Sequence, residues 1–332
     1  MKRNVVKIFA RAILASLLYP MLTAAAAADA AASERSSVFV LGNEQFRVEV
    51  VTEPNGLLEK FGPRFDRTAM VRQVQLKNRS YLWRDGLTDE FGIMGLGVLG
   101  YENAGPNDVF IKVGVGELVK QNNEKYQFWQ RYPIRKLLPA TVHTEPNTVT
   151  VTQQSEVVNG YAYSYIKRYR VKPKSATLLI EYELTNTGKR VFSFEQYNHN
   201  WFAFEGIPIG PAYYVEPAFA VSDKLPSSLR REGAGLRLSG SKGAYLASEL
   251  TAPAENNRLT VAHPATGQSV EISGDFPVAR FALFADANAI CPEVFARFKL
   301  AAGKRAAWKR TYRFFNSGPL PEFIPHNDAG QR

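Results

Sequence analysis

Two stretches of the sequence place proton-transferring side chains in unusual surroundings. The first, "EQYNHNWFAF" at residues 195–204, sets His199 between two asparagines in a run rich in aromatic residues. The second, "AICPEVFARF" at 289–298, sets Glu293 in a run made mostly of apolar residues. A carboxyl group in apolar surroundings is unfavourable unless it is paired or used, and an imidazole titrates near neutral pH. Side chains of these two kinds can transfer protons, so both stretches are candidates for chemistry.

Each stretch also has a purely structural explanation. His199 would then be a buried histidine whose neighbours satisfy its hydrogen bonds, with Asn198 and Asn200 fixing a turn. Glu293 would be a glutamate on an edge strand that points into water. Taken one at a time, neither stretch decides between a structural role and a chemical one.

Strands must position these residues, because apolar and polar residues alternate along most of the chain. No stretch carries a helical apolar stripe longer than about two turns, and no proline- or serine-rich linker divides the sequence. Alternation predicts strands at 46–51, 71–76, 109–118, 147–157, 161–171, 176–186 and 191–204, with more in the C-terminal third. This series predicts an all-β protein with one domain, a large antiparallel β-sandwich.

Alternation also assigns the side chains of the strand at 191–204 to two faces. Glu195, Tyr197, His199 and Trp201 share one face, whereas Asn198 projects from the other. The first face becomes polar and aromatic toward its C-terminal half. Such a surface suits the floor of a sugar-sized cleft.

The two ends of the chain are expected to lie outside the sandwich. Residues 1–30 combine a basic start, a short apolar core and an alanine-rich run, which predicts a removable signal peptide. A membrane anchor is the alternative, but the apolar core is too short to span a bilayer comfortably. We therefore expect an exported bacterial protein, periplasmic or secreted, with no membrane span after cleavage. The sandwich would occupy residues 31–316, followed by an irregular tail at 317–332.

Charge and cysteine content narrow the choice of partners. The 332-residue chain has a formal net charge of +10, but its basic residues are dispersed, with no basic block. We therefore expect no nucleic-acid partner, while a mild positive field would favour anionic small molecules. The single cysteine, Cys291, excludes an internal disulfide, so the domain would depend on a large core.

Taken together, the two chemical stretches resemble the galactose mutarotase-like superfamily, which includes the aldose 1-epimerases. "NHNWF" at 198–202 is similar to the "NHxYF"-like strand of that superfamily. Glu293 in "ICPEVF" is similar to its glutamate about a hundred residues later, and "LAAGKRAAWKRTYRF" at 300–314 to its closing hairpin. The resemblance covers most of the chain after the signal segment and indicates an exported bacterial branch of the superfamily.

The resemblance implies a reaction at C1 of a free sugar that needs neither a metal nor a cofactor. Glu293 would remove the proton from the C1 hydroxyl group while His199 donates a proton to the ring oxygen. The ring opens, the C1–C2 bond rotates, and the steps reverse to give the other anomer. The two side chains would act from opposite sides of the ring, with their polar atoms about the width of a pyranose apart.

The chain departs from the superfamily pattern in its N-terminal half. Typical aldose epimerases carry another histidine there in an "HGG"-like stretch, whereas the first histidine here is His143, in the peripheral run "PATVHTEPN". The polar candidates are instead Arg64 in "FGPRFDRTAMV" and Lys112 in "VFIKVGVGEL", although either charge also fits a solvated loop. If both cations face the cleft of His199, they suit the carboxylate or phosphate of an acidic sugar, such as a uronic acid.

The expected ligand is therefore a mono- or oligosaccharide, neutral or anionic. The substrate-binding candidates are Arg64, Lys112, Tyr197, Asn198 and Trp201. Two other functions fit much the same set. In a polysaccharide lyase, His199 or Tyr197 would act as the base while Arg64 or Asn198 neutralises a uronate. A non-catalytic carbohydrate-binding protein would bind glycans without turnover.

Overall fold

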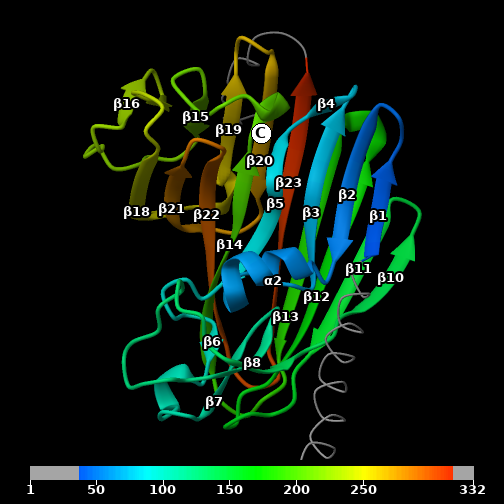
Figure 1. Ribbon diagram of the computed structural model, residues 1–332, viewed down its shortest axis with the longest axis vertical. Coiled ribbons are helices and arrows are strands. Elements are labelled where there is room, and N and C mark those ends of the chain that lie inside the picture. Colours follow the sequence, from blue (N-terminus) through cyan, green and yellow to red (C-terminus); the bar gives the residue numbers. More distant parts are fainter. Residues whose placement is uncertain (1–36, 317–332) are drawn as a thin grey trace, which may run out of the picture. The chain divides into compact units, whose positions relative to one another are not determined.

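Residues 37–316, which the computed structural model describes, form two large antiparallel sheets packed face to face and a small third sheet (Figure 1). The predicted all-β sandwich is confirmed. The segments predicted as a signal peptide, 1–30, and as a tail, 317–332, lie outside the described residues. Within the described range, no helix is long and apolar enough to cross a membrane.

The strands that carry His199 and Glu293 are neighbours in one large sheet, which we call the site sheet. In the described part of the chain its order is β1–β2–β3–β5–β14–β22–β21–β18, and β4 pairs with β3. The strands are β1 (Ser37–Gly42), β2 (Phe46–Thr52), β3 (Ala69–Leu76), β4 (Arg79–Ser80), β5 (Leu82–Phe91), β14 (Phe192–Phe202), β22 (Ile290–Leu300), β21 (Val278–Ala285) and β18 (Ala244–Ala252). Strand β14 therefore lies between β5 and β22 (Figure 1).

The second large sheet, the facing sheet, covers the inner face of the site sheet. Its order in the described residues is β10–β11–β12–β13–β23–β20–β19–β15–β17–β16. The strands are β10 (Thr141–Glu145), β11 (Thr148–Gln154), β12 (Tyr163–Lys172), β13 (Thr177–Asn186), β23 (Arg305–Asn316), β20 (Gln268–Gly274), β19 (Arg258–His263), β15 (Tyr214–Pro217), β17 (Gly235–Leu238) and β16 (Leu229–Glu232).

Short elements complete the described structure. The small sheet consists of β6 (Val98–Leu99), β7 (Val109–Lys112), β8 (Gly116–Val119) and β9 (Ile134–Leu137). One α-helix, α2 (Asn55–Phe61), runs into the 3₁₀ turn η1 (Gly62–Arg64). The other 3₁₀ turns are η2 (Tyr101–Asn103), η3 (Pro173–Ser175), η4 (Phe204–Gly206) and η5 (Ala254–Asn256).

Burial follows the alternation that predicted the strands. On β12, Tyr163, Tyr165 and Tyr169 are fully buried between the two sheets. Arg170, which directly follows Tyr169 and points to the other face, is exposed. Burying each aromatic side chain contributes roughly 1.5–3 kcal/mol relative to leaving it in water. The core between the sheets is therefore large, as expected for a domain whose only cysteine, Cys291, is free and buried.

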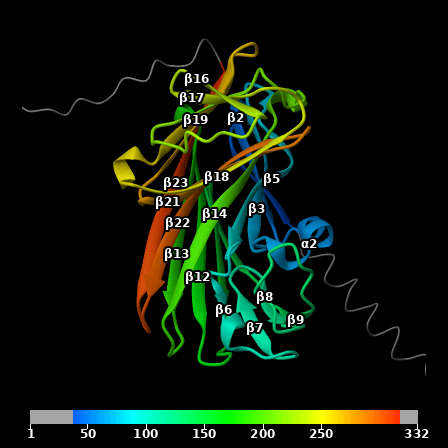
Figure 2. The ribbon, with the colours of Figure 1, turned by 90° about the vertical axis from the view of Figure 1, so that its left-hand side faces the viewer.

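Strand β14 differs from this pattern because both of its faces are buried over most of its length. Helix α2 lies on the outer face of the site sheet (Figures 1 and 2). Phe61 at its end stacks on Trp201, with ring centroids 5.9 Å apart, and Phe65 meets the ring of His199 edge-on at 5.6 Å. We call residues 55–65, together with the loop 121–133, the cover.

The predicted strand at 109–118 is instead a tight hairpin, and that prediction is wrong. Strands β7 and β8 pair with each other across a turn at residues 113–115. Gly114 has a φ of 79°, and a Cβ atom there would meet the side chain of Asp66 at 2.5 Å. Only glycine fits such a position, so the alternating run reverses direction.

Candidate active site

His199 and Glu293 lie side by side on the outer face of the site sheet. Gln196 pairs with Ala296 and Phe202 with Ile290, and the same register places His199 opposite Glu293. His199 Nε2 lies 3.3 Å from Glu293 Oε1. Both residues are buried, with 3% and 4% of their surface exposed. The contact is closer than the ring-wide separation expected from the sequence, because directly opposed side chains share one face.

The backbone around this pair is irregular for an identifiable reason. Pro292 on β22 has no amide hydrogen, so it cannot donate to a neighbouring strand. Its carbonyl oxygen instead accepts a hydrogen bond of 2.6 Å from Asn200 Nδ2. Asn200 Oδ1 in turn accepts from Tyr312 Oη at 3.0 Å. Asn200 therefore has a structural role, holding β14 against both β22 and the facing sheet.

Aromatic rings enclose the imidazole of His199. The ring of Trp201 stacks on it with centroids 4.1 Å apart, and Phe284 on β21 approaches it edge-on at 5.8 Å. Phe65 of the cover closes a further side. This enclosure removes water from the acid–base pair, which strengthens electrostatic interactions inside it.

Burial shifts the pKa values of the pair in opposite directions. Burial raises the pKa of Glu293 well above its ordinary value of 4.5; Arg64 opposes this shift, and the charge of Glu90 adds to it. Burial and the positive charge of Arg64 lower the pKa of His199 well below 6.5. The pair therefore holds one titratable proton over a wide pH range. A single proton transfer along the 3.3 Å contact converts the neutral pair into carboxylate and imidazolium.

Arg64 and Tyr197 meet beside this pair on the carboxylate of Glu90. Arg64 Nε donates to Glu90 Oε2 at 2.8 Å, and Arg64 Nη2 donates to Tyr197 Oη at 3.1 Å. The Tyr197 hydroxyl donates to the same Glu90 oxygen. Burial alone would lower the pKa of Arg64, but Glu90 and Tyr197 hold it above its usual range. Arg64 is therefore a fixed cation near His199.

Lys112 reaches the same carboxylate from the small sheet. Its Nζ lies 3.8 Å from Glu90 Oε1 and donates a hydrogen bond of 2.7 Å to Tyr126 Oη. Burial lowers the pKa of Lys112 to about 8, against the raising effect of Glu90. The structure thus brings Arg64, Lys112 and Tyr197 together around one glutamate.

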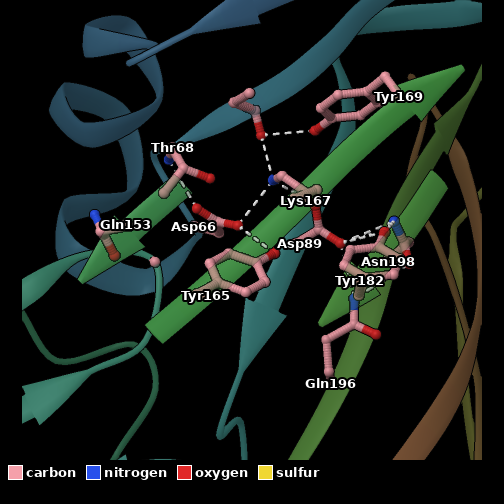
Figure 3. Close-up of polar contacts among 12 residues, drawn as sticks. Asp66, Thr68, Asp89, Gln153, Tyr165, Lys167, Tyr169, Tyr182, Gln196 and Asn198 are labelled. Atoms are coloured by element: carbon pink, nitrogen blue, oxygen red, sulfur yellow. Dashed lines mark hydrogen bonds and ion pairs between the residues drawn. The ribbon is translucent and has the colours of Figure 1, made fainter. Parts of the chain in front are cut away.

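Asn198 lies on the opposite face of β14, between the two large sheets. Its Nδ2 donates to Asp89 Oδ1 at 3.0 Å and to Tyr182 Oη at 2.9 Å (Figure 3). The backbone of the site sheet separates these contacts from His199, as alternation requires. Of the residues proposed from the sequence, the structure therefore brings all except Asn198 to the outer face.

The contacts of Asn198 belong to a polar network inside the core. Lys167 lies at its centre and donates to Asp66 Oδ2 at 2.8 Å, Asp89 Oδ2 at 2.9 Å and the carbonyl oxygen of Ala69 at 2.7 Å (Figure 3). All three hydrogens of the ammonium group are thereby used. This satisfied arrangement explains the polar residues on the inner face of β14 as structural.

Four buried polar atoms around the acid–base pair make no hydrogen bond to any described residue. They are His199 Nδ1, Trp201 Nε1, Thr88 Oγ1 and Glu90 Oε1. Thr88 on β5 pairs directly with His199, so its side chain lies on the same face. Buried polar atoms are nearly always partnered, so these four atoms are candidate contacts for a polar ligand.

Sequence reasoning missed Thr88 and Glu90 because it predicted no strand at β5. In the run "LTDEF" at 87–91, the two residues alternate with Asp89, which faces the core network. That spacing of two was the available signal. His143, by contrast, lies on the edge strand β10 with 71% of its side chain exposed, as its peripheral context suggested.

Comparison with known proteins supports the fold. No protein-family model matches the chain, and no curated protein matches it. The galactose mutarotase related enzyme of Lactobacillus acidophilus superposes with a TM-score of 0.54 at 12% identity, over 84% of this chain and 97% of that one. A galactose mutarotase-like protein from Lactobacillus casei gives 0.51 at 14%, over 84% and 100%. The aldose epimerase homologue from C. elegans gives 0.53 at 13%, over 85% and 100%.

The described residues therefore adopt the galactose mutarotase-like fold, and the resemblance drawn from the sequence is confirmed at that level. Identities this low establish the fold and nothing about the reaction.

Proposed function

We propose that this protein is an aldose 1-epimerase-like isomerase that interconverts the anomers of a free sugar without a cofactor. Glu293 and His199 transfer the protons. The observation that carries the proposal is their 3.3 Å contact within a buried, aromatic enclosure. Solved structures that are named for galactose mutarotase share the fold, which is compatible with this reaction.

The shared proton of the pair gives the reaction its starting state. With the proton on His199, Glu293 is a carboxylate that accepts the proton of the C1 hydroxyl group. His199 donates its proton to the ring oxygen as the bond from C1 to that oxygen breaks. The open-chain aldehyde rotates about C1–C2, and the reverse transfers close the ring on the other face. The pair ends with the proton count with which it began.

A sugar reaches the pair only when the cover moves, because neither side chain is open to solvent. Buried residues such as Phe65 and Tyr126 anchor the base of the cover, whereas the contacts across its outer part lie closer to the surface. Arg131 donates to the carbonyl oxygens of Glu59 and Lys60, at 3.1 and 2.8 Å, which joins the loop 121–133 to helix α2. Lys60 Nζ lies 2.6 Å from Asp85 Oδ2. Such exposed contacts cost little to break, and the entering ring then separates His199 from Glu293.

The four atoms without a hydrogen bond to a described residue favour a polyhydroxylated ligand. The indole nitrogen of Trp201 only donates, the carboxylate of Glu90 only accepts, and the hydroxyl of Thr88 does both. Sugar hydroxyl groups also do both, so they satisfy a mixed set of this kind. The face of Trp201 adds an aromatic surface beside the imidazole.

The charge around the site favours an acidic sugar, such as a uronic acid. Arg64 and Lys112 are two cations that share the single carboxylate of Glu90. Below the pKa of Lys112, about 8, this group carries a net positive charge. An anionic sugar would compensate it.

We do not propose a polysaccharide lyase, because only Arg64, of the two residues expected to neutralise a uronate, lies on the face of His199. The side chain of Asn198 is held between the sheets, on the face opposite to His199. A lyase would release an unsaturated product that absorbs ultraviolet light.

Anomer exchange measured by two-dimensional NMR tests the proposal. The purified protein should accelerate exchange between the α and β anomers of at least one free sugar in a panel of neutral hexoses, hexose phosphates and hexuronic acids. Saturable binding without any acceleration would instead identify a carbohydrate-binding protein.

A further inference from the structure

Arg280 lies on the same face of the site sheet as the acid–base pair. On β21, Ala282 pairs with Glu293 of β22, and Arg280 pairs with Phe295. Its guanidinium group lies over the ring of Phe295, 4.5 Å from the centroid. The side chain is 7% exposed. Neither the composition nor the resemblance of the sequence singled out this arginine.

Arg280 is poorly partnered for a buried cation. Its one described ion pair joins Nε to Glu249 Oε1 at 3.6 Å, and it makes no hydrogen bond to any described residue. Nearby Arg297 is 44% exposed, yet its Nε donates to Glu195 Oε1 at 2.8 Å. The buried arginine thus has the weaker partner and the exposed arginine the stronger one. Glu249 is itself 68% exposed, so it neutralises Arg280 only loosely.

The guanidinium group of Arg280 therefore has an ion pair but no hydrogen-bonded carboxylate among the described residues. Burying a charge is unfavourable unless the charge is paired and hydrogen-bonded. The fork of an arginine matches two oxygens of a carboxylate or a phosphate. The loosely held carboxylate of Glu249 occupies part of that position and can turn into water.

We propose that Arg280 anchors the anionic group of the sugar on which Glu293 and His199 act, through a paired contact with a carboxylate or phosphate. The inference rests on the proposed function and assigns it a substrate class. Residues diagonal across paired strands lie about 7–8 Å apart, within reach of a long side chain. Arg280 therefore holds a group remote from C1, such as the carboxylate of a uronic acid or a phosphate on C6, while C1 faces the acid–base pair.

Methyl glycosides test this anchor without catalysis, because their rings cannot open. Dissociation constants are measured by calorimetry at 0.15 M salt, which screens distant charges. The charged probes are the methyl glycosides of galacturonic acid, glucuronic acid and glucose 6-phosphate; the neutral probes are methyl galactoside and methyl glucoside. The wild type should bind a charged probe at least about tenfold more tightly than its neutral counterpart. Tighter binding of the uronates or of the phosphate identifies the anionic group.

Three variants separate a direct contact from a general field. Arg280→Gln should abolish the preference, and Arg280→Lys should keep part of it because the charge remains without the fork. Arg297→Gln also removes one positive charge that pairs with Glu249, at 3.4 Å, and this variant should still prefer the charged probe. Glu249→Gln should tighten binding of the charged probe, since it removes the competing carboxylate. A purely structural arginine would not produce that gain.

The inference is overturned if the wild type prefers neutral glycosides, or if Arg280→Gln keeps the preference for charged ones. An equal loss in Arg297→Gln would also overturn it, because only a long-range field would then act. A different outcome would contradict the proposed isomerase function alone. Tight, Arg280-dependent binding of a charged glycoside with no accelerated exchange of the free acid would leave the anchor standing and remove the isomerase.

Discussion

Glu293 and His199 face each other across neighbouring strands with their polar atoms 3.3 Å apart, and the two buried side chains hold a single titratable proton. This relationship predicts how stability depends on pH. In the unfolded chain the glutamate titrates near its ordinary pKa of 4.5 and the histidine near 6.5. Between these values the folded and unfolded pairs each carry one proton, so the contribution of the pair to stability does not change.

Single substitutions should reveal two opposite dependences of the free energy of unfolding on pH, one from each residue of the pair. In Glu293→Gln only His199 remains, its folded pKa is lowered, and the stability it contributes above pH 6.5 is lost as the pH falls. In His199→Gln only Glu293 remains, its folded pKa is raised, and the stability present below pH 4.5 is lost as the pH rises. Relative to the wild type, the two variants should change in opposite directions between pH 5 and 6, each by up to about 1.4 kcal/mol.

Urea unfolding at several pH values provides that measurement. The double variant His199→Gln/Glu293→Gln should be parallel to the wild type between pH 5 and 6. Above pH 6.5 the wild type should lose stability, because the histidine of the unfolded chain releases its proton while the folded pair keeps one. The double variant should not show this loss. Parallel pH profiles for all four proteins would contradict the shared proton.

Removing the carboxylate of Glu90 should destabilise the protein more than removing one of its cations. Glu90→Gln leaves both Arg64 and Lys112 without their common counter-ion, and breaking a buried ion pair costs about 3–5 kcal/mol. Lys112→Met removes a buried charge whose pKa is already lowered to about 8, so its cost should be smaller. Chemical denaturation at pH 7 compares the two, and an equal or greater loss in Lys112→Met would contradict this arrangement.

The core network should tolerate the loss of one aspartate better than the loss of its lysine. Lys167→Met leaves Asp66 and Asp89 facing each other in the core, and we expect a loss of about 3–5 kcal/mol. Burial raises the pKa of Asp66, with Lys167 opposing the shift, so Asp66→Asn removes a carboxylate that is costly to ionise. Its stability loss in urea should be clearly smaller. A similar loss for both variants would mean that the network does not depend on the ammonium group.

Loosening the cover should expose the imidazole of His199. Arg131→Ala removes the two hydrogen bonds that tie the loop 121–133 to helix α2. Modification of His199 by diethylpyrocarbonate, followed by mass spectrometry of the peptide, should become several times faster. Arg135→Ala is the matched control, because Arg135 on β9 pairs at 3.6 Å with Glu117 rather than with helix α2. Equal rates in the three proteins would show that the cover opens by another route.

Alternation in the sequence was sufficient to predict the sandwich and the face that His199 shares with Tyr197 and Trp201. It also placed Asn198 on the opposite face, where the structure has it, although that residue was proposed to bind substrate. The structural explanation of such polar residues, satisfaction by neighbours, applies to Asn198 and Asn200. For His199 it fails at Nδ1, which makes no hydrogen bond to a described residue.

The other features of the site depend on contacts that alternation cannot encode. Strand β5 was not predicted because it is buried on both faces, so its acidic residues do not alternate with apolar ones. Gly86 within it has a φ of 67°, which further disguises the run. The loose pairing of Arg280 depends on which carboxylates reach it from β18, and that requires the register of three strands.

The most direct test of the account is the rate of anomer exchange in Glu293→Gln, on the free sugar that the wild type converts fastest. Glutamine keeps the shape of the side chain but cannot accept the proton of the C1 hydroxyl group. General-base catalysis contributes about 10²–10⁴-fold, so exchange measured by NMR should slow at least about 100-fold. Binding of the corresponding methyl glycoside should persist, which would show that the site is intact. Exchange at the wild-type rate in this variant would contradict the acid–base role of Glu293 and His199.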